Sequence, residues 1–279
     1  MALDGKNKND LTRPIPAAVQ RQVRERCGFG CVICGSMFYQ YDHLGVEFKD
    51  ADEHDPEKIV LLCGGCHDKK TRKFLSTATI ERHAKAPRAK QDSFSWGGFD
   101  LGVEYPEIIM GTIVTRRSAS LINVDGEDIF SILPPEAEGL PFRVNASIYN
   151  KHGELVIKIV NNEFQALATN WDVEVVGGKV SVRSASGVFN LVIRSEPPHR
   201  LVIERLDMIY RGMSIICQEG RNITIESGAG LVQARSGKFE GCERVLGFHS
   251  GGMSMGFNCE LVELSEVSAN PADVPRRLI

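Results

Sequence analysis

The clearest chemistry in this 279-residue sequence belongs to two pairs of cysteines. Each pair has two residues between its cysteines, in Cys31-Val-Ile-Cys34 and Cys63-Gly-Gly-Cys66. This spacing lets both thiolates of a tight turn contact one ion, and two such turns supply the four soft ligands of a closed tetrahedral Zn²⁺ site. We therefore predict that these cysteines bind one structural zinc ion. Four buried free thiols are the alternative interpretation.

The other four cysteines do not have this spacing. Cys27 precedes Gly28 at the expected end of a helix, where a small buried residue is the natural interpretation. Cys217, Cys242 and Cys259 lie far apart among strand-like segments, so we assign them to the core or to no role. In a reducing compartment cysteines do not persist as disulfides, which favours metal ligation for the closely spaced pairs.

A second chemical signal lies beside the cysteine pairs. The segment Tyr41-Asp42-His43-Leu44 stands between them, and His67 follows the second pair directly. The order C-x-x-C, then Asp-His on a strand, then C-x-x-C-His at the head of a helix resembles the zinc-knuckle branch of the HNH endonucleases. The segments CGFGCVICG, YDHL and HDPEKIVLLCGGCHDKKT, within residues 20–76, carry the resemblance.

The resemblance implies a ββα-metal fold that is held together by the zinc ion. In this fold Asp42 and His67 face one another across a second, catalytic ion, Mg²⁺ or Mn²⁺. His43 is then the general base that takes a proton from the attacking water. The implied activity is hydrolysis of DNA phosphodiester bonds. A non-catalytic zinc-dependent nucleic-acid-binding protein is the alternative.

One position departs from the pattern of this family. Many members have an asparagine five residues before the second cysteine pair, where this chain has Lys58. In the family that asparagine orients the loop and the general base. We expect either weaker catalysis or transfer of the task to His54 or Asp55 nearby, and we include His54 among the candidate catalytic residues.

A run of basic residues follows His67. Such a run next to a metal site indicates contacts to DNA phosphates, which strengthen binding without reading the base sequence. A solvated helix face is the alternative interpretation. The basic residues are Lys69, Lys70, Arg72 and Lys73.

Local patterns predict the elements that position these residues. A helix is expected over residues 16–27, where proline stands at the start and Gly28 follows the end. Strands are expected at 38–44 and 58–63, a helix from His67, and a helix capped by Ser76. Together they predict a nuclease domain over residues 1–86.

From residue 87 onward the pattern changes. Residues 87–98 mix proline, glycine, serine and charge without periodicity, which predicts a linker. Residues 99–279 contain many short apolar runs, so the fold class is α+β: a small zinc-stapled domain followed by an all-β domain. A Gly177-Gly178 pair inside an alternating segment predicts a hairpin. Further strands are predicted at 155–160, 188–193, 201–203, 213–217, 223–225 and 231–234.

Two architectures compete for the β-rich region. Strands separated by frequent turns favour a sandwich or a barrel. Apolar pairs also recur at Ile157, Val180, Leu201 and Ile223, in steps of 23, 21 and 22 residues, which keeps a β-solenoid as the alternative.

Composition and charge limit the functions that need to be considered. A hydrophobic fraction of 42% with 25% charged residues is typical of a globular protein. No apolar stretch reaches the roughly 20 residues that span a bilayer, and the first ten residues lack the apolar centre of a signal peptide, so we expect a soluble cytoplasmic protein without a membrane partner.

Charge is divided unevenly along the chain. Residues 1–98 carry 16 Lys and Arg against 13 Asp and Glu, whereas residues 99–279 carry 17 against 23. The acidic β-rich part repels DNA, so we expect it to regulate cutting or to mediate assembly, through a homo-oligomer or a regulatory partner. Defence of bacteria against foreign DNA is a context in which such control is needed.

Overall fold

The computed structural model describes residues 6–249 and 252–264, and its fold is mostly β. Residues 1–5 of the predicted nuclease domain, and 250–251 and 265–279 of the predicted β-rich domain, lie outside the described residues. The helices are α1 (Ala17–Cys27), α2 (Gly64–Thr71), α3 (Thr77–Lys85) and α4 (Arg88–Gln91), with short 3-10 turns η1 (Phe48–Asp50) and η2 (Pro56–Lys58).

The strands form one small sheet and two large mixed sheets. Strands β1 (Tyr39–His43) and β2 (Ile59–Cys63) make the small sheet. The eight-stranded sheet has the order β20-β19-β6-β7-β8-β9-β10-β3: Gly252–Phe257, Arg244–His249, Ser120–Val124, Glu127–Leu133, Arg143–Tyr149, Leu155–Val160, Glu163–Leu167 and Phe94–Gly98.

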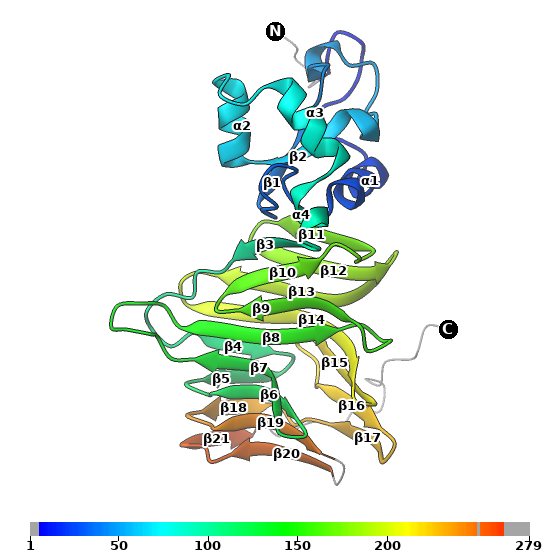
Figure 1. Cartoon of the computed structure of the whole chain (residues 1–279). Helices are drawn as coiled ribbons and strands as arrows, with labels where there is room; N and C mark the ends of the chain where they lie inside the picture. Colours follow the sequence, from blue (N-terminus) through cyan, green and yellow to red (C-terminus); the bar gives the residue numbers. More distant parts are fainter. Residues whose placement is uncertain (1–5, 250–251, 265–279) are drawn as a thin grey trace.

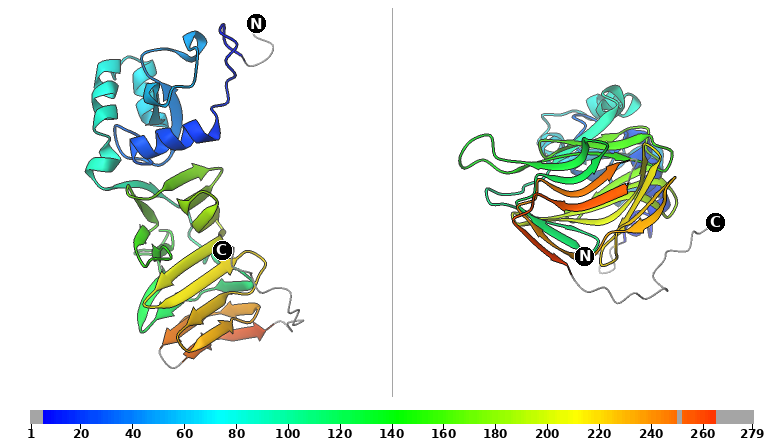
Figure 2. Two further views of the ribbon diagram at one scale, coloured as in Figure 1. Left: turned by 90° about the vertical axis from the view of Figure 1, so that its right-hand side faces the viewer. Right: turned by 90° about the horizontal axis from the view of Figure 1, so that it is seen from below.

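The eleven-stranded sheet has the main order β11-β12-β13-β14-β4-β5-β18-β21: Asp172–Val176, Lys179–Ala185, Val188–Glu196, Arg200–Tyr210, Glu107–Met110, Ile113–Arg116, Gly237–Glu240 and Leu261–Leu264. A branch from β14 adds β15 (Met213–Gln218), β16 (Thr224–Ser227) and β17 (Gly230–Gln233). The two large sheets lie as facing layers (Figures 1 and 2), and buried apolar side chains from both form one cluster between them.

The first part of the chain has a small apolar cluster of its own. Strand β2 supplies four consecutive buried residues, 59–62, which pack against Val23 of α1 and Ile80 of α3. Gly28 ends α1 in the left-handed conformation at φ 70°, and the Ser76 hydroxyl accepts a hydrogen bond from the Thr79 amide at the start of α3. These helix ends agree with the sequence pattern.

Helix α2 begins earlier than the sequence pattern predicts. Its first residue is Gly64, three residues before His67, because the Cys63 sulfur accepts a hydrogen bond from the Cys66 amide and thereby caps the helix. Two glycines at a helix start are poor helix formers, which is why the pattern placed the beginning too late. His67 consequently lies in the first turn, where its position is fixed by a complete helical backbone.

The predicted linker differs from the structure. Within residues 87–98, α4 packs Ala89 into the interior and β3 joins the eight-stranded sheet beside β10, with Ser95 fully buried. The Trp96 indole also donates a hydrogen bond to the Cys34 carbonyl, at 2.8 Å. This segment is therefore a packed connection that contacts the cysteine-bearing loop.

The predicted hairpin is confirmed. Gly177 and Gly178 adopt positive φ angles of 59° and 76° in the turn between β11 and β12, as a tight two-residue turn requires. The ladders from β11 to β14 are antiparallel, whereas a solenoid stacks parallel rungs, so the solenoid alternative does not describe these strands.

Two cysteines without a predicted role form a disulfide. Cys242 lies between β18 and β19, and Cys259 lies between β20 and β21. Because β19 pairs with β20 and β18 pairs with β21, the two connections come together at one place. Cys217 is buried, as predicted. In the described part of the chain, none of the helices has the length and apolar character needed to cross a membrane.

A buried ion pair joins helix α1 to the eleven-stranded sheet. The Arg24 guanidinium donates two hydrogen bonds of 2.8 Å to the Asp172 carboxylate, and the two side chains are 4% and 2% exposed. Arg183 donates to the same carboxylate at 2.6 Å. Burial disfavours the charged form of Arg24, but the bonds to Asp172 and Tyr41 outweigh it and raise the pKa above the usual value. Asp172 is thus the shared anion of two arginines.

Replacing Asp172 should therefore cost much stability. In Asp172→Ala two guanidinium groups lose their buried partner, and we expect the free energy of unfolding to fall by about 3–5 kcal/mol. Glu174→Ala is the matched control, because Glu174 pairs with the same arginines but is 27% exposed, and it should lose less. Urea unfolding of the full chain measures both. Equal losses in the two variants would contradict the assignment.

Candidate metal centre and adjoining site

The four predicted zinc ligands converge. Their sulfur atoms all lie within 4.8 Å of one another, and the Cys34 and Cys63 sulfurs are 3.6 Å apart. Zinc–sulfur bonds of about 2.3 Å in a tetrahedron place the sulfurs about 3.8 Å apart, so the donors fit one zinc ion. Within the described residues this is the one group of three or more potential ligand side chains that meets such a distance limit.

Backbone geometry builds the first cysteine turn. The Gly35 amide donates to the Cys31 carbonyl at 2.8 Å, and Gly35 itself has a φ of 80°. A Cβ atom at Gly30 would lie 2.4 Å from the Gly35 carbonyl oxygen, so only glycine allows this close approach. The turn therefore depends on the glycines that surround Cys31 and Cys34.

The thiols differ in their readiness to ionise. The hydrogen bond from Cys34 lowers the pKa of Cys31 to about 5, against the opposing effect of burial, and backbone hydrogen bonds lower it further. Burial raises the pKa of Cys27 to about 11, and Cys27 lies outside the cluster. Burial also raises the pKa of Cys66, which belongs to the cluster, to about 12. The convergence of the four sulfurs, and not the pKa contrast, therefore separates the predicted ligands from the core residue Cys27.

Asp42 and His67 also come together. Asp42 lies on β1 and His67 lies in the first turn of α2, and their Oδ1 and Nε2 atoms are 3.6 Å apart. Lys70, one helical turn after His67, contacts Asp42 Oδ2 and donates to the His43 carbonyl at 3.0 Å. The predicted phosphate ligand Lys70 is therefore bonded to Asp42, a contact that the basic run did not indicate.

His43 lies in a different environment from Asp42. Successive side chains of a strand point to opposite faces, and the His43 ring packs against Phe48 and His54, with centroid separations of 5.8 Å to each. Burial, followed by the charge of His54, lowers the pKa of His43 below the usual 6.5. Its buried Nε2 has no hydrogen-bond partner among the described residues. His43 is therefore held neutral near pH 7.

The loop before β2 carries Lys58, which stands where many members of the resembled family have an asparagine, and also its two predicted substitutes, His54 and Asp55. The Lys58 side chain is exposed and pairs with Asp55 at 3.4 Å, while Asp55 caps η2 by accepting from the Glu57 amide. The His54 Nε2 lies 2.8 Å from the Thr12 carbonyl oxygen. Of the two predicted substitutes for the asparagine, His54 is the one whose ring lies beside His43.

The basic residues after His67 divide into two groups. Lys69 and Lys73 are exposed and have no ion pair among the described residues, whereas Arg72 pairs with Asp68 at 3.0 Å. Phe74 follows directly and is 83% exposed. An exposed aromatic ring beside free lysines suits contact with nucleic acid, and the basic run alone did not single it out. The sequence analysis did not include Phe74, although its position just after the basic helix could have indicated an exposed aromatic ring.

Comparisons with protein-family models, with curated proteins and with solved structures find no match to this chain.

Proposed function

We propose that the protein is a metal-dependent endonuclease that hydrolyses DNA phosphodiester bonds. The observation that carries the proposal is the approach of Asp42 Oδ1 to His67 Nε2, at 3.6 Å, directly beside the four-cysteine cluster. A carboxylate on a strand and an imidazole on the following helix, directly after a C-x-x-C pair in the sequence, is the arrangement that the resemblance implies for a ββα-metal nuclease. We assign residues 6–86 of the described chain to this fold.

The donor pair is compatible with a divalent cation. Two ligand atoms 3.6 Å apart are close enough to hold one Mg²⁺ or Mn²⁺ ion between them, which would take its remaining ligands from water and phosphate. When bound, the ion stabilises the negative charge that develops on the phosphate and on the leaving oxygen. Asp42 and His67 are the residues that would hold it.

The remaining residues have separate tasks. His43, kept neutral because burial lowers its pKa, is the proposed acceptor of a proton from the attacking water, and its buried Nε2 has to become accessible for this step. Packing against His54 and Phe48 fixes the orientation of its ring. Lys69 and Lys73 hold the DNA backbone by their charge, and Phe74 offers an apolar surface to a base or sugar.

A second candidate function has its own supporting observation. Lys70 bonds the Asp42 carboxylate, which neutralises the charge that a catalytic cation needs. A zinc-dependent module that binds nucleic acid without cutting it accounts for this contact, for the cysteine cluster and for the exposed lysines. In the nuclease, by contrast, Lys70 has to leave Asp42 and pair with a DNA phosphate.

Cutting distinguishes the two functions. Supercoiled plasmid incubated with the full chain and Mg²⁺ or Mn²⁺ is expected to become nicked and linear, and EDTA should stop the reaction. A Lys69→Ala, Lys73→Ala double variant should bind DNA more weakly and with a shallower salt dependence. Retarded DNA in a gel, without cutting under any of these metals, would favour the binding module.

The β-rich part is proposed to control this activity or to mediate assembly. The described residues after 99 form most of two large sheets with a shared apolar core, and the buried Arg24–Asp172 pair ties them to helix α1 of the proposed nuclease part. Restraint of cutting until a signal arrives suits a nuclease that acts on foreign DNA. Both a homo-oligomer and a separate regulatory partner are compatible with this proposed control.

A further inference from the structure

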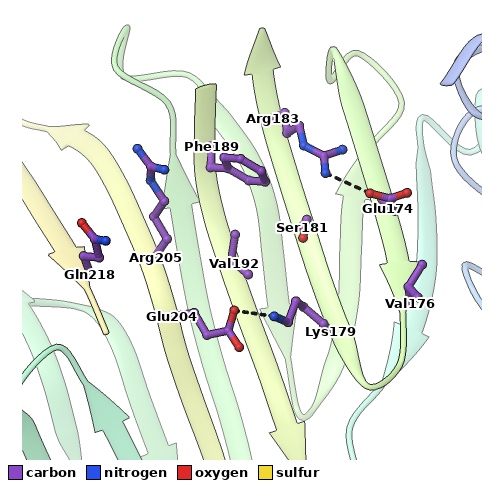
Figure 3. Close-up of a pocket in the computed structure, with 10 residues that line it drawn as sticks. All are labelled: Glu174, Val176, Lys179, Ser181, Arg183, Phe189, Val192, Glu204, Arg205 and Gln218. Atoms are coloured by element: carbon purple, nitrogen blue, oxygen red, sulfur yellow. Dashed lines mark hydrogen bonds and ion pairs between the residues drawn. The ribbon is translucent and has the colours of Figure 1, made fainter. Parts of the chain in front are cut away.

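The open face of the eleven-stranded sheet has a shallow depression over β11 to β15. Its volume is about 570 Å³, within the range of roughly 300–1,000 Å³ that small-molecule sites occupy. Figure 3 shows its charged side chains around one aromatic ring. Lys179 pairs with Glu204 at 2.6 Å on one side, and Arg183 pairs with Glu174 at 2.9 Å on the other.

Phe189 lies between two guanidinium groups. Arg183 is directly opposite Phe189 in the pairing of β12 with β13, and its guanidinium carbon is 4.7 Å from the ring centroid. The guanidinium carbon of Arg205 is 5.5 Å from the same centroid. The three side chains therefore combine a flat apolar surface with two cations.

A β-bulge places Arg205 in this position. Val192 pairs with Arg205 while the next residue, Ile193, pairs with Ile203, so Glu204 is an extra residue in β14. The bulge brings Glu204 and Arg205 to the same open face, where regular alternation would have turned one of them inward. Arg205 is exposed and has no ion pair among the described residues, so its charge is available to a ligand.

We propose that this depression binds a nucleotide, which joins a planar ring to a phosphate group. The exposed Arg205 guanidinium moves off the Phe189 ring, the planar ring of the nucleotide stacks there in its place, and the phosphate accepts hydrogen bonds from Arg205 and Arg183. Glu204 and Glu174 bind the lysine and the arginine that flank them, which leaves Arg205 as the main anion contact. A free phosphate lacks the stacking contribution, and a nucleoside lacks the ionic one.

The depression is connected to the proposed nuclease site by an unbroken series of contacts. Arg183 shares the Asp172 carboxylate with Arg24, and Arg24 donates to the Tyr41 hydroxyl at 2.8 Å. Tyr41 precedes Asp42 on β1. A phosphate that attracts Arg183 weakens its bond to Asp172, and Arg24 then takes a larger share of that carboxylate. This control rests on the proposed nuclease function, whereas the binding of a nucleotide does not.

Calorimetric titration of the full chain with adenosine monophosphate tests the binding site. We expect one molecule bound per chain, and binding at least about tenfold weaker for adenosine alone and for inorganic phosphate. Arg205→Ala should weaken the binding of adenosine monophosphate at least about tenfold, as should Phe189→Leu, which keeps apolar bulk but removes the ring. Arg235→Ala, an exposed arginine outside the depression, is the matched control and should bind normally.

Two results would overturn the proposal. One is no heat of binding at millimolar adenosine monophosphate, and the other is unchanged affinity in Arg205→Ala when thermal unfolding shows that this variant is folded. Hydrogen exchange of α1 and β1 amides with and without the nucleotide measures the coupling, and unchanged exchange despite binding would refute that step. If the nucleotide binds but no DNA is cut, the nuclease function fails and the nucleotide site stands.

Discussion

The Cys66→Ser variant is expected to lose its zinc and, with it, the fold of the first part of the chain. Cys66 supplies one of four converging sulfurs, and a hydroxyl is a poor substitute for a thiolate on zinc. Structural zinc contributes about 10–16 kcal/mol in small zinc-dependent domains, far more than the apolar cluster around Val23, β2 and Ile80 can supply alone. Metal analysis of the freshly purified wild type should give one zinc per chain.

Cys27→Ala is the matched control for this experiment. Cys27 is a buried thiol close to Cys31 in sequence, but it is not part of the cluster, so its removal should leave the zinc content at one per chain and cost only packing energy. Limited proteolysis and circular dichroism of both variants report the fold. A Cys66→Ser chain that keeps its zinc and its helices, or a Cys27→Ala chain that loses them, would contradict the four-thiolate site.

The cysteine spacing predicted the four-cysteine cluster because a C-x-x-C turn is a local feature, set by a few residues and their backbone angles. The same holds for the helix end at Gly28, the Ser76 cap and the Gly177-Gly178 hairpin, where each signal lies within a few residues of the element it defines. Local patterns therefore predicted the elements of the first part and several strands of the second.

The features that were missed depend on contacts between distant residues. Strand β3 was predicted as linker because its pairing partner, β10, lies more than sixty residues later in the chain. The Cys242–Cys259 disulfide depends on which strands neighbour one another, and no spacing rule reveals that. The Arg24–Asp172 pair spans 148 positions in the sequence, so neither residue alone indicated it.

The side chains that the motif singles out have contacts that the motif did not indicate. The motif indicated Asp42, His43 and His67, and the structure brings the first and the last together. The motif did not indicate the hydrogen bond from Lys70 to Asp42, because a basic run does not show which acidic residue each lysine contacts. The ring cluster of His43, His54 and Phe48 needs the loop between the strands to fold back, which local pattern does not encode.

Substitution of His43 should slow cutting strongly without preventing binding. A general base contributes about 10²–10⁴-fold to a rate, so His43→Ala should nick plasmid slower by about that factor. The reason is the lowered pKa: burial and the nearby His54 disfavour the protonated form, so wild-type His43 can accept a proton at neutral pH. The zinc content should match the wild type, because His43 does not belong to the cysteine cluster. The retardation of DNA in a gel should also match, because Lys69 and Lys73, which hold the DNA in this proposal, are unchanged.

Variants of two further histidines distinguish a catalytic role of His43 from a general loss of structure. His83→Ala, in α3 and outside the site, should cut at the wild-type rate. His54→Ala should cut more slowly than the wild type but faster than His43→Ala, because the His54 Nε2 is held by the Thr12 carbonyl and its ring acts on His43 only by packing and charge. If His54→Ala loses as much activity as His43→Ala, or if His43→Ala cuts normally, the proton acceptor is a different group and His43 is a structural residue of the loop.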